Sequence, residues 1–320
     1  GDSIDFDFTF QAHSVEQIGE ISGHGQFDGL TEALLLDKPQ LNLSTHVKDL
    51  PVAFFNAYLG EEAANKLNGS ISFNMDYQGD FEQRYNAAGV FDLSALSYSE
   101  TQLWEHPLPG LATNIGYQVN ISGDTLDIDK LDIKLGELSL SAKGSIHDWH
   151  NDPVLTDTTV SGQTPLAVLD YILPWKIIPY ADEIRDRVHR TGHFTLEKLT
   201  LPETNLNRLI DEPALLLTLL QGSGRLQDAA ITTPLDIHYI TDISGNLLMQ
   251  DGTIQAEQIQ STSGPLTLPT MNIAASDLSG YLKINASAKG PVRLTTSDAA
   301  ELSTLLKKNH LKHLTGPIYL

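Results

Sequence analysis

Cysteine is absent from this chain of 320 residues, which excludes disulfides, thiolate chemistry and Cys-based metal sites. Basic residues are scarce: 20 Lys and Arg stand against 41 Asp and Glu, for a formal charge of −21. Binding to nucleic acid requires clusters of Lys and Arg, as does electrostatic docking on anionic lipid. The composition therefore argues against both, and the acidic residues are expected to keep an extended β protein soluble.

Long hydrophobic runs are also missing. The longest, residues 214–220, contains a Thr and is far short of the ~20 residues of a membrane span. No signal peptide is recognisable. The chain begins inside an alternating pattern at Ile4 and stops inside a predicted strand, Pro317–Leu320. We therefore expect a fragment of a longer protein, with any membrane anchor lying outside this sequence.

Aromatic residues make up only 7% of the chain, but 41% of it is hydrophobic, enough for a sizeable core. Apolar and polar residues alternate strictly over 115–122, and Gly123-Asp124 follows as a hairpin turn. A second alternating run, 282–294, is about twice the usual strand length. These patterns predict a mainly β protein built on a long, twisted antiparallel sheet with one dry face and one wet face.

A few amphipathic helices are predicted near residues 50–66, 165–190, 206–220 and 297–312. In the first, Phe54, Phe55, Tyr58, Leu59 and Leu67 form one apolar face before Gly69 begins a strand. Pro213 is expected to break the third helix or to start its second half.

Three glycines suggest a long internal repeat. Gly69, Gly192 and Gly316 each follow a helical pattern at nearly equal intervals and each precede a strand. We therefore expect two consecutive repeat-like β units, 1–150 and 151–320, with the polar segment His147–Pro153 as their boundary. A slip in the alternation at Ala95/Leu96 predicts a bulge or bend.

Residues that could carry chemistry are few. Asp127, Asp129 and Asp132 could bind Ca²⁺, but they alternate on a strand and no calcium-binding motif surrounds them, which favours a solvated face. No nucleophile elbow, phosphate loop or dinucleotide fingerprint occurs. A glycosidase needs little more than two carboxylates, yet nothing selects a pair. We expect no enzymatic activity and no cofactor.

Two histidine pairs are alternative metal ligands. His147 and His150 lie in the polar segment, where a simple loop is the preferred interpretation. His310 and His313 stand three residues apart on the last predicted helix, and a basic cap of the helix C-terminus is preferred there. We therefore expect no metal site.

Several segments share one sequence pattern, in which a glycine is followed by an alternating strand and a turn. They are LNGSISFNMDYQGDF, AAGVFDLSALSYS, TGHFTLEKLTL and the stretch that begins ITDISGNLLMQDGTI. They resemble the AsmA-like proteins of the Gram-negative envelope, which include TamB-like and YhdP-like branches. The segment from ILPWKIIPYADEIRDRVHRTGHFTLEKLTL onward is most similar to the YhdP-like type. The resemblance covers most of residues 155–320 and, more loosely, 1–150.

This resemblance implies a long β-groove in the periplasm, anchored by an inner-membrane helix outside this fragment. It also implies passive conduction or shielding of phospholipid acyl chains, in support of the outer membrane, with other envelope proteins as further partners. Aliphatic inward faces with few aromatics and no inward charge would suit such a groove, because acyl chains gain ~0.8 kcal/mol per buried methylene. The residues expected to face lipid are Ile71, Phe73, Met75, Tyr77, Ile115, Tyr117, Val119, Ile121, Leu138, Leu140, Leu235, Ile237, Tyr239, Leu282 and Ile284.

The same faces could instead form the closed core of a β-sandwich, or of a sheet packed on helices. In that case the chain would be a structural or adhesive β module that binds protein or glycan. The two alternatives differ in whether the inward side chains line an open surface.

Overall fold

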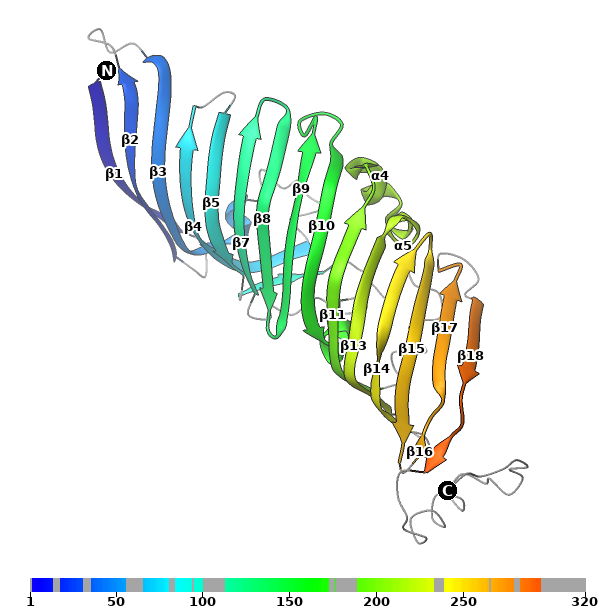
Figure 1. Ribbon diagram of the computed structural model, residues 1–320. Helices are drawn as coiled ribbons and strands as arrows, with labels where there is room; N and C mark the ends of the chain where they lie inside the picture. Colours follow the sequence, from blue (N-terminus) through cyan, green and yellow to red (C-terminus); the bar gives the residue numbers. More distant parts are fainter. Residues whose placement is uncertain are drawn as a thin grey trace. The chain divides into compact units, whose positions relative to one another are not determined.

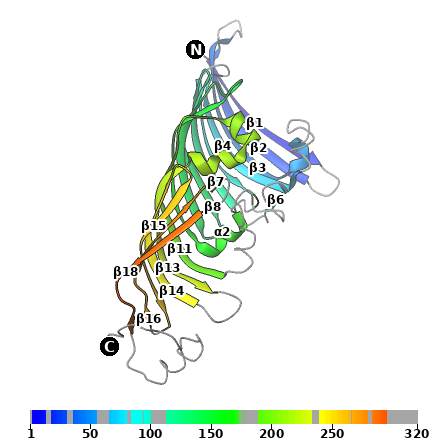
Figure 2. The ribbon, with the colours of Figure 1, turned by 90° about the vertical axis from the view of Figure 1, so that its right-hand side faces the viewer.

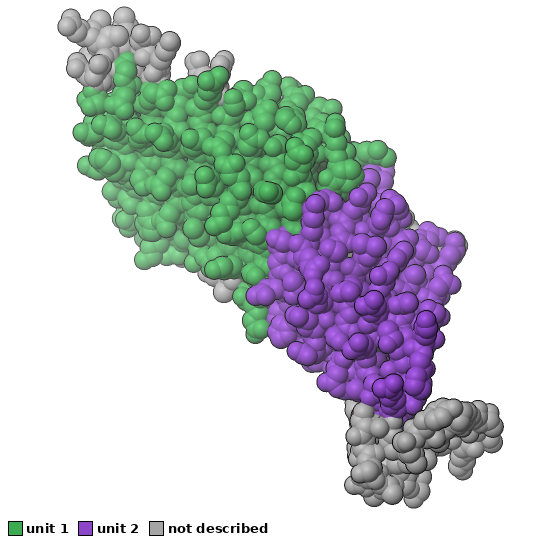
Figure 3. Space-filling model, in the orientation of Figure 1, with its two compact units in different colours: residues 1–160, 201–211 green, residues 161–200, 212–320 purple. Residues whose placement is uncertain are grey.

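The computed structural model describes residues 2–13, 18–30, 36–55, 66–80, 84–93, 95–99, 113–172, 176, 189–232, 239–264, 266–278 and 283–294. The protein is mainly β, with one long antiparallel sheet and a few short helices, which confirms the predicted fold class. The chain divides into two compact units (Figure 3). Unit 1 comprises residues 1–160 and 201–211, and unit 2 comprises 161–200 and 212–320.

The division between the units falls inside a strand, β10 (Val154–Pro165), whereas the sequence places it after residue 150. The polar segment His147–Pro153 lies within unit 1, where it forms the turn between β9 and β10. Solvated turns and domain boundaries are both rich in polar residues, so the polarity of this segment did not distinguish the two. Residues 201–211 return to unit 1 and bring β12 (Thr204–Asn205) against the first residues of β10.

Unit 1 is an antiparallel meander, coloured blue to green in Figure 1. Its further strands are β1 (Asp2–His13), β2 (Ile18–Leu30), β3 (Leu36–Pro51), β4 (Leu67–Gly79), β5 (Arg84–Asp92), β6 (Leu96–Tyr98), β7 (Thr113–Ser122), β8 (Thr125–Leu135) and β9 (Leu138–His147). The slip at Ala95/Leu96 marks a real break. The chain leaves β5, turns at Ala95, and β6 pairs with the beginning of β4, which β5 does not cover.

Unit 2 continues the same plan with antiparallel ladders β11–β13–β14–β15–β17–β18. Its strands are β11 (His189–Leu201), β13 (Gln221–Thr232), β14 (Tyr239–Gln250), β15 (Thr253–Ser263), β16 (Leu266–Thr267), β17 (Thr270–Ser276), β18 (Lys283–Lys289) and β19 (Arg293–Leu294). The predicted strand 282–294 is therefore not continuous. The chain turns at Gly290, whose φ is +118°, and β19 pairs with β16.

The helices agree with the sequence in part. Pro213 does divide the segment 206–220, because α4 (Leu206–Asp211) ends before it, and η3 (Pro213–Leu215) and α5 (Leu216–Leu219) follow. In the region 165–190, α2 spans Leu166–Ile172.

The predicted helix 50–66 begins too early. Residues 50 and 51 belong to β3, η1 (Val52–Phe55) follows, Lys66 is helical and Leu67 already lies in β4. Tyr58 and Leu59, and the predicted helix 297–312, lie outside the described residues.

A row of backbone bulges crosses unit 2. Asp228, Asp242 and Gln258 have φ near +50°, each within a strand and each at a shift in pairing register. Asp tolerates this left-handed conformation better than most residues. Bulges bend a strand and increase its twist, and the strands do bend along their length (Figures 1 and 2). Gly192, with φ +98°, stands opposite the first bulge.

The small core of each unit lies at these bends. In unit 2, the residues that directly follow the three bulges, Ala229, Ile243 and Ile259, are 2–6% exposed and form one cluster. In unit 1, Asp49 has φ +51°, and the next residue, Leu50, is 2% exposed and packs with Val47 and Ala12. A left-handed residue therefore turns the following side chain into the inside of the bend. Gly69, near the start of β4, has a positive φ like that of Gly192, so two of the three predicted repeat glycines share this backbone conformation.

Candidate functional site

One side of the unit 1 sheet is apolar from β1 to β9. Cross-strand pairing sets these side chains in rows, for example Phe73 opposite Phe91, Phe91 opposite Ile115, and Ile115 opposite Ile133. We call this surface the apolar face of unit 1. Its members are Ile4, Phe6, Phe8, Phe10, Ile21, Phe27, Leu41, Leu43, Val47, Ile71, Phe73, Met75, Tyr77, Tyr85, Ala87, Phe91, Ile115, Tyr117, Val119, Ile121, Leu126, Ile128, Leu131, Ile133, Leu138, Leu140, Ala142 and Ile146.

Aromatic rings cover glycines on this face. A Cβ atom on Gly25 would lie 2.2 Å from Cζ of Phe6, and one on Gly23 would lie 2.5 Å from Cζ of Phe8. Ring contacts continue along the face, with centroids 5.3 Å apart for Phe6–Phe27 and 5.1 Å apart for Phe73–Phe91. Each ring fills the space above a glycine of the neighbouring strand, where that strand has no side chain.

The aromatic content contradicts one expectation. An aliphatic inward face with few aromatics was predicted, yet the β1–β7 part of the apolar face is rich in Phe and Tyr. The strands near 115–121, 138–146 and 282–294 are mostly aliphatic, whereas β1, β2 and β5 contribute further rings. From the row of Ile4 and Phe27 onward, none of the paired rows on this face in the described strands of unit 1 contains a charged side chain.

Most of the apolar face is only partly covered. The four predicted residues of β4 and three of the four in β7 are half-buried. Phe10 is 61% exposed and Ile4 47%, whereas full burial is confined to a few positions such as Val47 at 1%. A second layer packed on this face would bury whole rows of it. Within the described strands, neighbouring side chains cover each other from the sides and leave their outer surfaces open.

The predicted lipid-facing residues of unit 1 do come together. The sets from β4 and β7 are joined through β5, and Leu138 and Leu140 of β9 join them through β8. In unit 2, Ile284 lies in β18 and is 62% exposed. The backbone of Tyr239 pairs with Thr232 in the β13–β14 ladder. Leu235, Ile237 and Leu282 lie outside the described residues.

Sequence reasoning missed much of this face. The rings of β1, the leucines of β3 and the inward residues of β5 and β8 were recognised as strands but not assigned to it. The signal was present in their alternation, and an aromatic residue in one strand facing Gly in the next was a further sign. Unit 2 carries an equivalent apolar side, whose members are Phe194, Leu196, Leu199, Leu226, Leu247, Met249, Ile254, Ala256, Ile273, Ala275, Ile284 and Ala286.

The opposite face is polar and hydrogen-bonded across strands. Ser44 Oγ donates to Asp76 Oδ1 at 2.6 Å, and Ser145 Oγ donates to Asp127 Oδ1 at 2.6 Å. In unit 2, Arg225 Nη2 lies 2.8 Å from Glu197 Oε1. These pairs satisfy carboxylates on a face that remains polar and solvated. The sequence predicts this for the residues that alternate with the apolar positions.

The candidate metal ligands are engaged elsewhere. Asp129 accepts a hydrogen bond from the Asn120 amide, and Asp132 pairs with Lys130 at 2.8 Å. Hydrogen bonds from Lys130 and Ser141 lower the pKa of Asp132. His147 Nδ1 lies 3.2 Å from Thr125 Oγ1. Among the described residues, no group of three His, Cys, Asp or Glu side chains could hold a metal ion. His310 and His313 lie outside the described residues.

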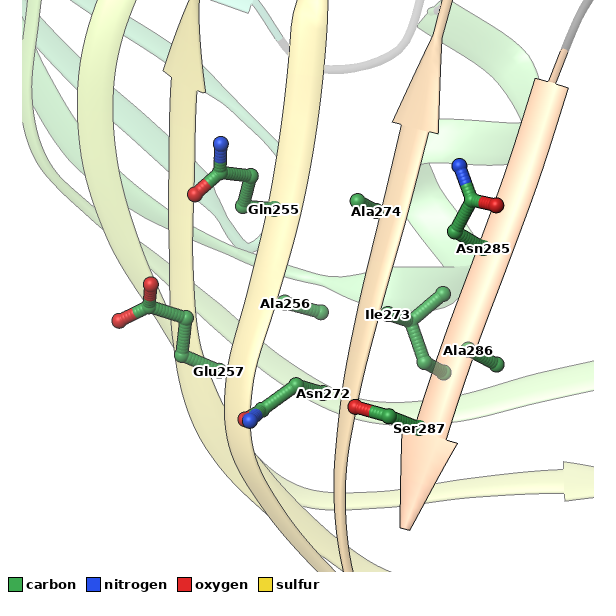
Figure 4. A pocket seen from close by; sticks show the side chains of 9 residues that line it. All are labelled: Gln255, Ala256, Glu257, Asn272, Ile273, Ala274, Asn285, Ala286 and Ser287. Atoms are coloured by element: carbon green, nitrogen blue, oxygen red, sulfur yellow. The ribbon is translucent and has the colours of Figure 1, made fainter.

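A shallow hollow of about 250 Å³ lies over β15, β17 and β18 (Figure 4). Its polar lining residues are Gln255, Glu257, Asn272, Asn285 and Ser287, and Ala274 lies among them. Amide, hydroxyl and carboxylate groups therefore line this space together with Ala256, Ile273, Ala274 and Ala286.

Three tyrosines stand on the apolar face of unit 1. Burial raises the pKa of Tyr77, Tyr85 and Tyr117 above the ordinary value, with nearby carboxylates as a smaller cause for Tyr77 and Tyr117. Tyr77 Oη donates to the carbonyl of Asp80 at 2.6 Å. The hydroxyls therefore stay protonated well into the alkaline range.

Among the helices that the structure describes, none combines the length and apolar character required to cross a membrane. Comparison with protein-family models, curated proteins and solved structures gave no match to this chain.

Proposed function

We propose that this chain binds phospholipid acyl chains on the apolar face of its sheet and conducts or shields them without making or breaking a bond. The observation that carries the proposal is an extended apolar face that is only half-buried. Exposed apolar patches larger than a few hundred Å² are rare on soluble proteins and mark a surface that something else covers. The resemblance to AsmA-like envelope proteins adds a periplasmic setting in a Gram-negative bacterium to the same proposal.

The dimensions of the face suit an acyl chain. Neighbouring strands lie about 4.8 Å apart, so the eight strands that form it span roughly 34 Å. A bilayer core of about 30 Å holds two chains end to end, so one extended acyl chain needs roughly 15 Å. Such a chain would cross three or four strands. Burying its methylenes at ~0.8 kcal/mol each gives on the order of 10 kcal/mol of gross stabilisation.

The chemistry of the face favours sliding over tight capture. Its contacts are mostly non-directional because the paired rows from β3 to β8 are mainly aliphatic and aromatic and carry no charged side chain. Without directional contacts, successive positions of a methylene chain have similar free energy. Passive movement follows, and no catalytic group is required.

Native mass spectrometry and solvent extraction of the purified chain test the proposal. We expect co-purified phospholipid, and we expect it to be lost when Ile115, Val119 and Ile121 are all changed to Asp. The matched control changes Asn114, Gln118 and Ser122 to Asp, which adds the same charge to the same strand on the polar face. Circular dichroism must show that both variants keep their β content.

A lipid-free protein that also fails to take up a fluorescent fatty acid would refute the proposal. That result would favour the structural or adhesive module, for which the polar hollow at Ala274 is the place to test glycan binding.

A further inference from the structure

The chain contains three methionines and no cysteine, and all three methionines lie on the apolar sides of the sheet. Met75 of β4 belongs to the apolar face of unit 1. Met249 of β14 and Met271 of β17 lie on the apolar side of unit 2. Each of the three is half-buried. The sulfur atoms that a peroxide can oxidise therefore lie on the surfaces proposed to hold acyl chains.

Met75 has a hydroxyl group beside it in the preceding strand. In the β3–β4 ladder it stands directly opposite Thr45, so the two side chains point to the same face. Thr45 Oγ1 is buried and has no hydrogen-bond partner among the residues that the structure describes. Buried hydroxyls are seldom left without a partner, because the lost hydrogen bond costs free energy. This position therefore holds a donor that a polar group on the Met75 side chain could use.

A second hydroxyl approaches Met75 from the following strands. Met75 pairs with Gly89 of β5, and Gly89 pairs with Tyr117 of β7. Tyr117 Oη lies 3.0 Å from the point at which a Cβ atom of Gly89 would stand. Cross-strand neighbours have their Cβ positions about 5 Å apart, so this hydroxyl also lies near the Met75 side chain. Two hydroxyl donors thus flank the thioether, one on each side.

The cross-strand partners of the other two methionines offer no such donor. Met249 lies between Gly222 of β13 and Ile254 of β15. Met271 lies between two aliphatic partners, in β15 and β18, and packs against the small core of unit 2. Both methionines therefore serve as comparisons within the same chain.

We propose that Met75 is an oxidation-sensitive site, at which hydrogen peroxide converts the thioether to a sulfoxide and thereby weakens acyl-chain binding. A lone pair of the sulfur attacks one peroxide oxygen, an S–O bond forms as the O–O bond breaks, and the second oxygen leaves as water after a proton shift. The sulfur is oxidised and the peroxide is reduced. Negative charge builds up on the oxygen bound to sulfur, and the hydroxyls of Thr45 and Tyr117 donate to it. The Thr45 hydroxyl thereby gains a partner.

A sulfoxide at this position changes the middle of the apolar face. It is polar and hydrated, so a methylene chain that crosses β4 must displace its water. We expect the affinity for an acyl chain to fall about tenfold. This consequence rests on the proposed function, whereas the preferential oxidation of Met75 does not.

Peptide mass spectrometry after brief treatment of the 320-residue chain with hydrogen peroxide tests the site. We expect Met75 to gain one oxygen about fivefold faster than Met249 or Met271, the factor that one net hydrogen bond supplies. Thr45→Val keeps the shape of the side chain and should slow the oxidation of Met75 to the rate of Met249. Thr9→Val, at an exposed position on the polar side of β1, is the matched control and should leave that rate unchanged. Equal rates for the three methionines, or an unchanged rate in Thr45→Val, overturn the proposal.

Uptake of a fluorescent fatty acid, measured before and after the same treatment, tests the consequence. Each protein is compared with its own untreated sample: the wild type and M249L/M271L should lose affinity about tenfold, and Met75→Leu should show no loss on treatment. Methionine sulfoxide reductases of both stereospecificities, with a thiol reductant, should restore the wild type. An oxidised wild type that binds fatty acid as before overturns the switch and leaves the proposed function standing. An untreated wild type that takes up no fatty acid refutes the proposed function and, with it, the effect on binding, and the oxidation rates then decide the site alone.

Discussion

The same substitution at two valines distinguishes an open apolar face from a covered one. Val47 and Val119 both lie on the apolar face of unit 1, but Val47 is 1% exposed and packs into the small core, whereas Val119 is half-buried. Val119 pairs with Ala87 on one side and Ile128 on the other. Changing each to Asp introduces an identical charge, so the loss in the free energy of unfolding shows whether other residues cover that position.

The expected magnitudes follow from burial. Full burial of a Val side chain is worth about 1.5–3 kcal/mol, so the half-buried Val119 loses roughly 1 kcal/mol, and the poorer strand propensity of Asp adds up to about 1 kcal/mol. Its carboxylate keeps contact with water. Val119→Asp should therefore lower the free energy of unfolding by about 2 kcal/mol. Val47→Asp loses the full transfer term and also buries an unpaired carboxylate, for a total of about 5 kcal/mol or more.

Urea unfolding followed by circular dichroism measures both variants against the wild type. The reasoning is refuted if Val119→Asp costs as much as Val47→Asp, because the apolar face would then lie under a second layer. Gln118→Asp, on the polar side of the same strand, is the control and should cost no more than the strand-propensity difference, up to about 1 kcal/mol.

Three further predictions follow from the geometry of the sheet. A Cβ on Gly89 would lie 2.0 Å from the carbonyl oxygen of Asn74, whereas one on Gly116 would have 3.8 Å to its nearest neighbour. Gly89→Ala should therefore destabilise by about 2 kcal/mol and Gly116→Ala should stabilise by about 0.5 kcal/mol in urea unfolding, and equal effects would contradict this difference in space. At Gln258, whose φ is +54°, replacement by Val should cost about 1–2 kcal/mol and replacement by Gly should be nearly neutral, with the difference absent if the bulge does not form. Because burial raises the pKa of Tyr77, Tyr85 and Tyr117 in the folded state, deprotonation favours unfolding, so stability should be unaffected below pH 9 and should fall as pH rises through about 10. Tyr117→Phe should flatten that fall, and titration by ultraviolet absorbance should show one fewer late-ionising tyrosine.

Alternation in the sequence was enough to predict the strands and their two faces. Ile115, Tyr117, Val119 and Ile121 occupy every second position, and the backbone of a strand must point them to one side. The turn at Gly123-Asp124 and the break at Pro213 were equally predictable, because each depends on a local backbone preference of the residues themselves. The predicted start of the helix at residue 50 was wrong because β3 runs on through Pro51.

Pairing and bending were decided only by the tertiary structure. Alternation shows which way a side chain points but not which strand lies beside it. No single segment could therefore show that side chains of β1, β5 and β8 lie on the same face as the predicted lipid-facing residues. The aromatic rings over Gly23 and Gly25 depend on that pairing. The bulges at Asp228, Asp242 and Gln258 interrupt otherwise regular strands, and an Asp in a strand is ordinarily just an outward polar residue.

The amino-acid sequence by itself therefore determined a two-faced β protein, since each residue's side is fixed by the backbone of its own strand. Where the faces bend, which side chains such as Leu50 and Ile243 become buried, and how much of the apolar face stays open depend on contacts between strands distant in the chain. Those contacts exist only once the strands have paired in register, and a single residue of bulge changes the side to which every later residue of the strand points.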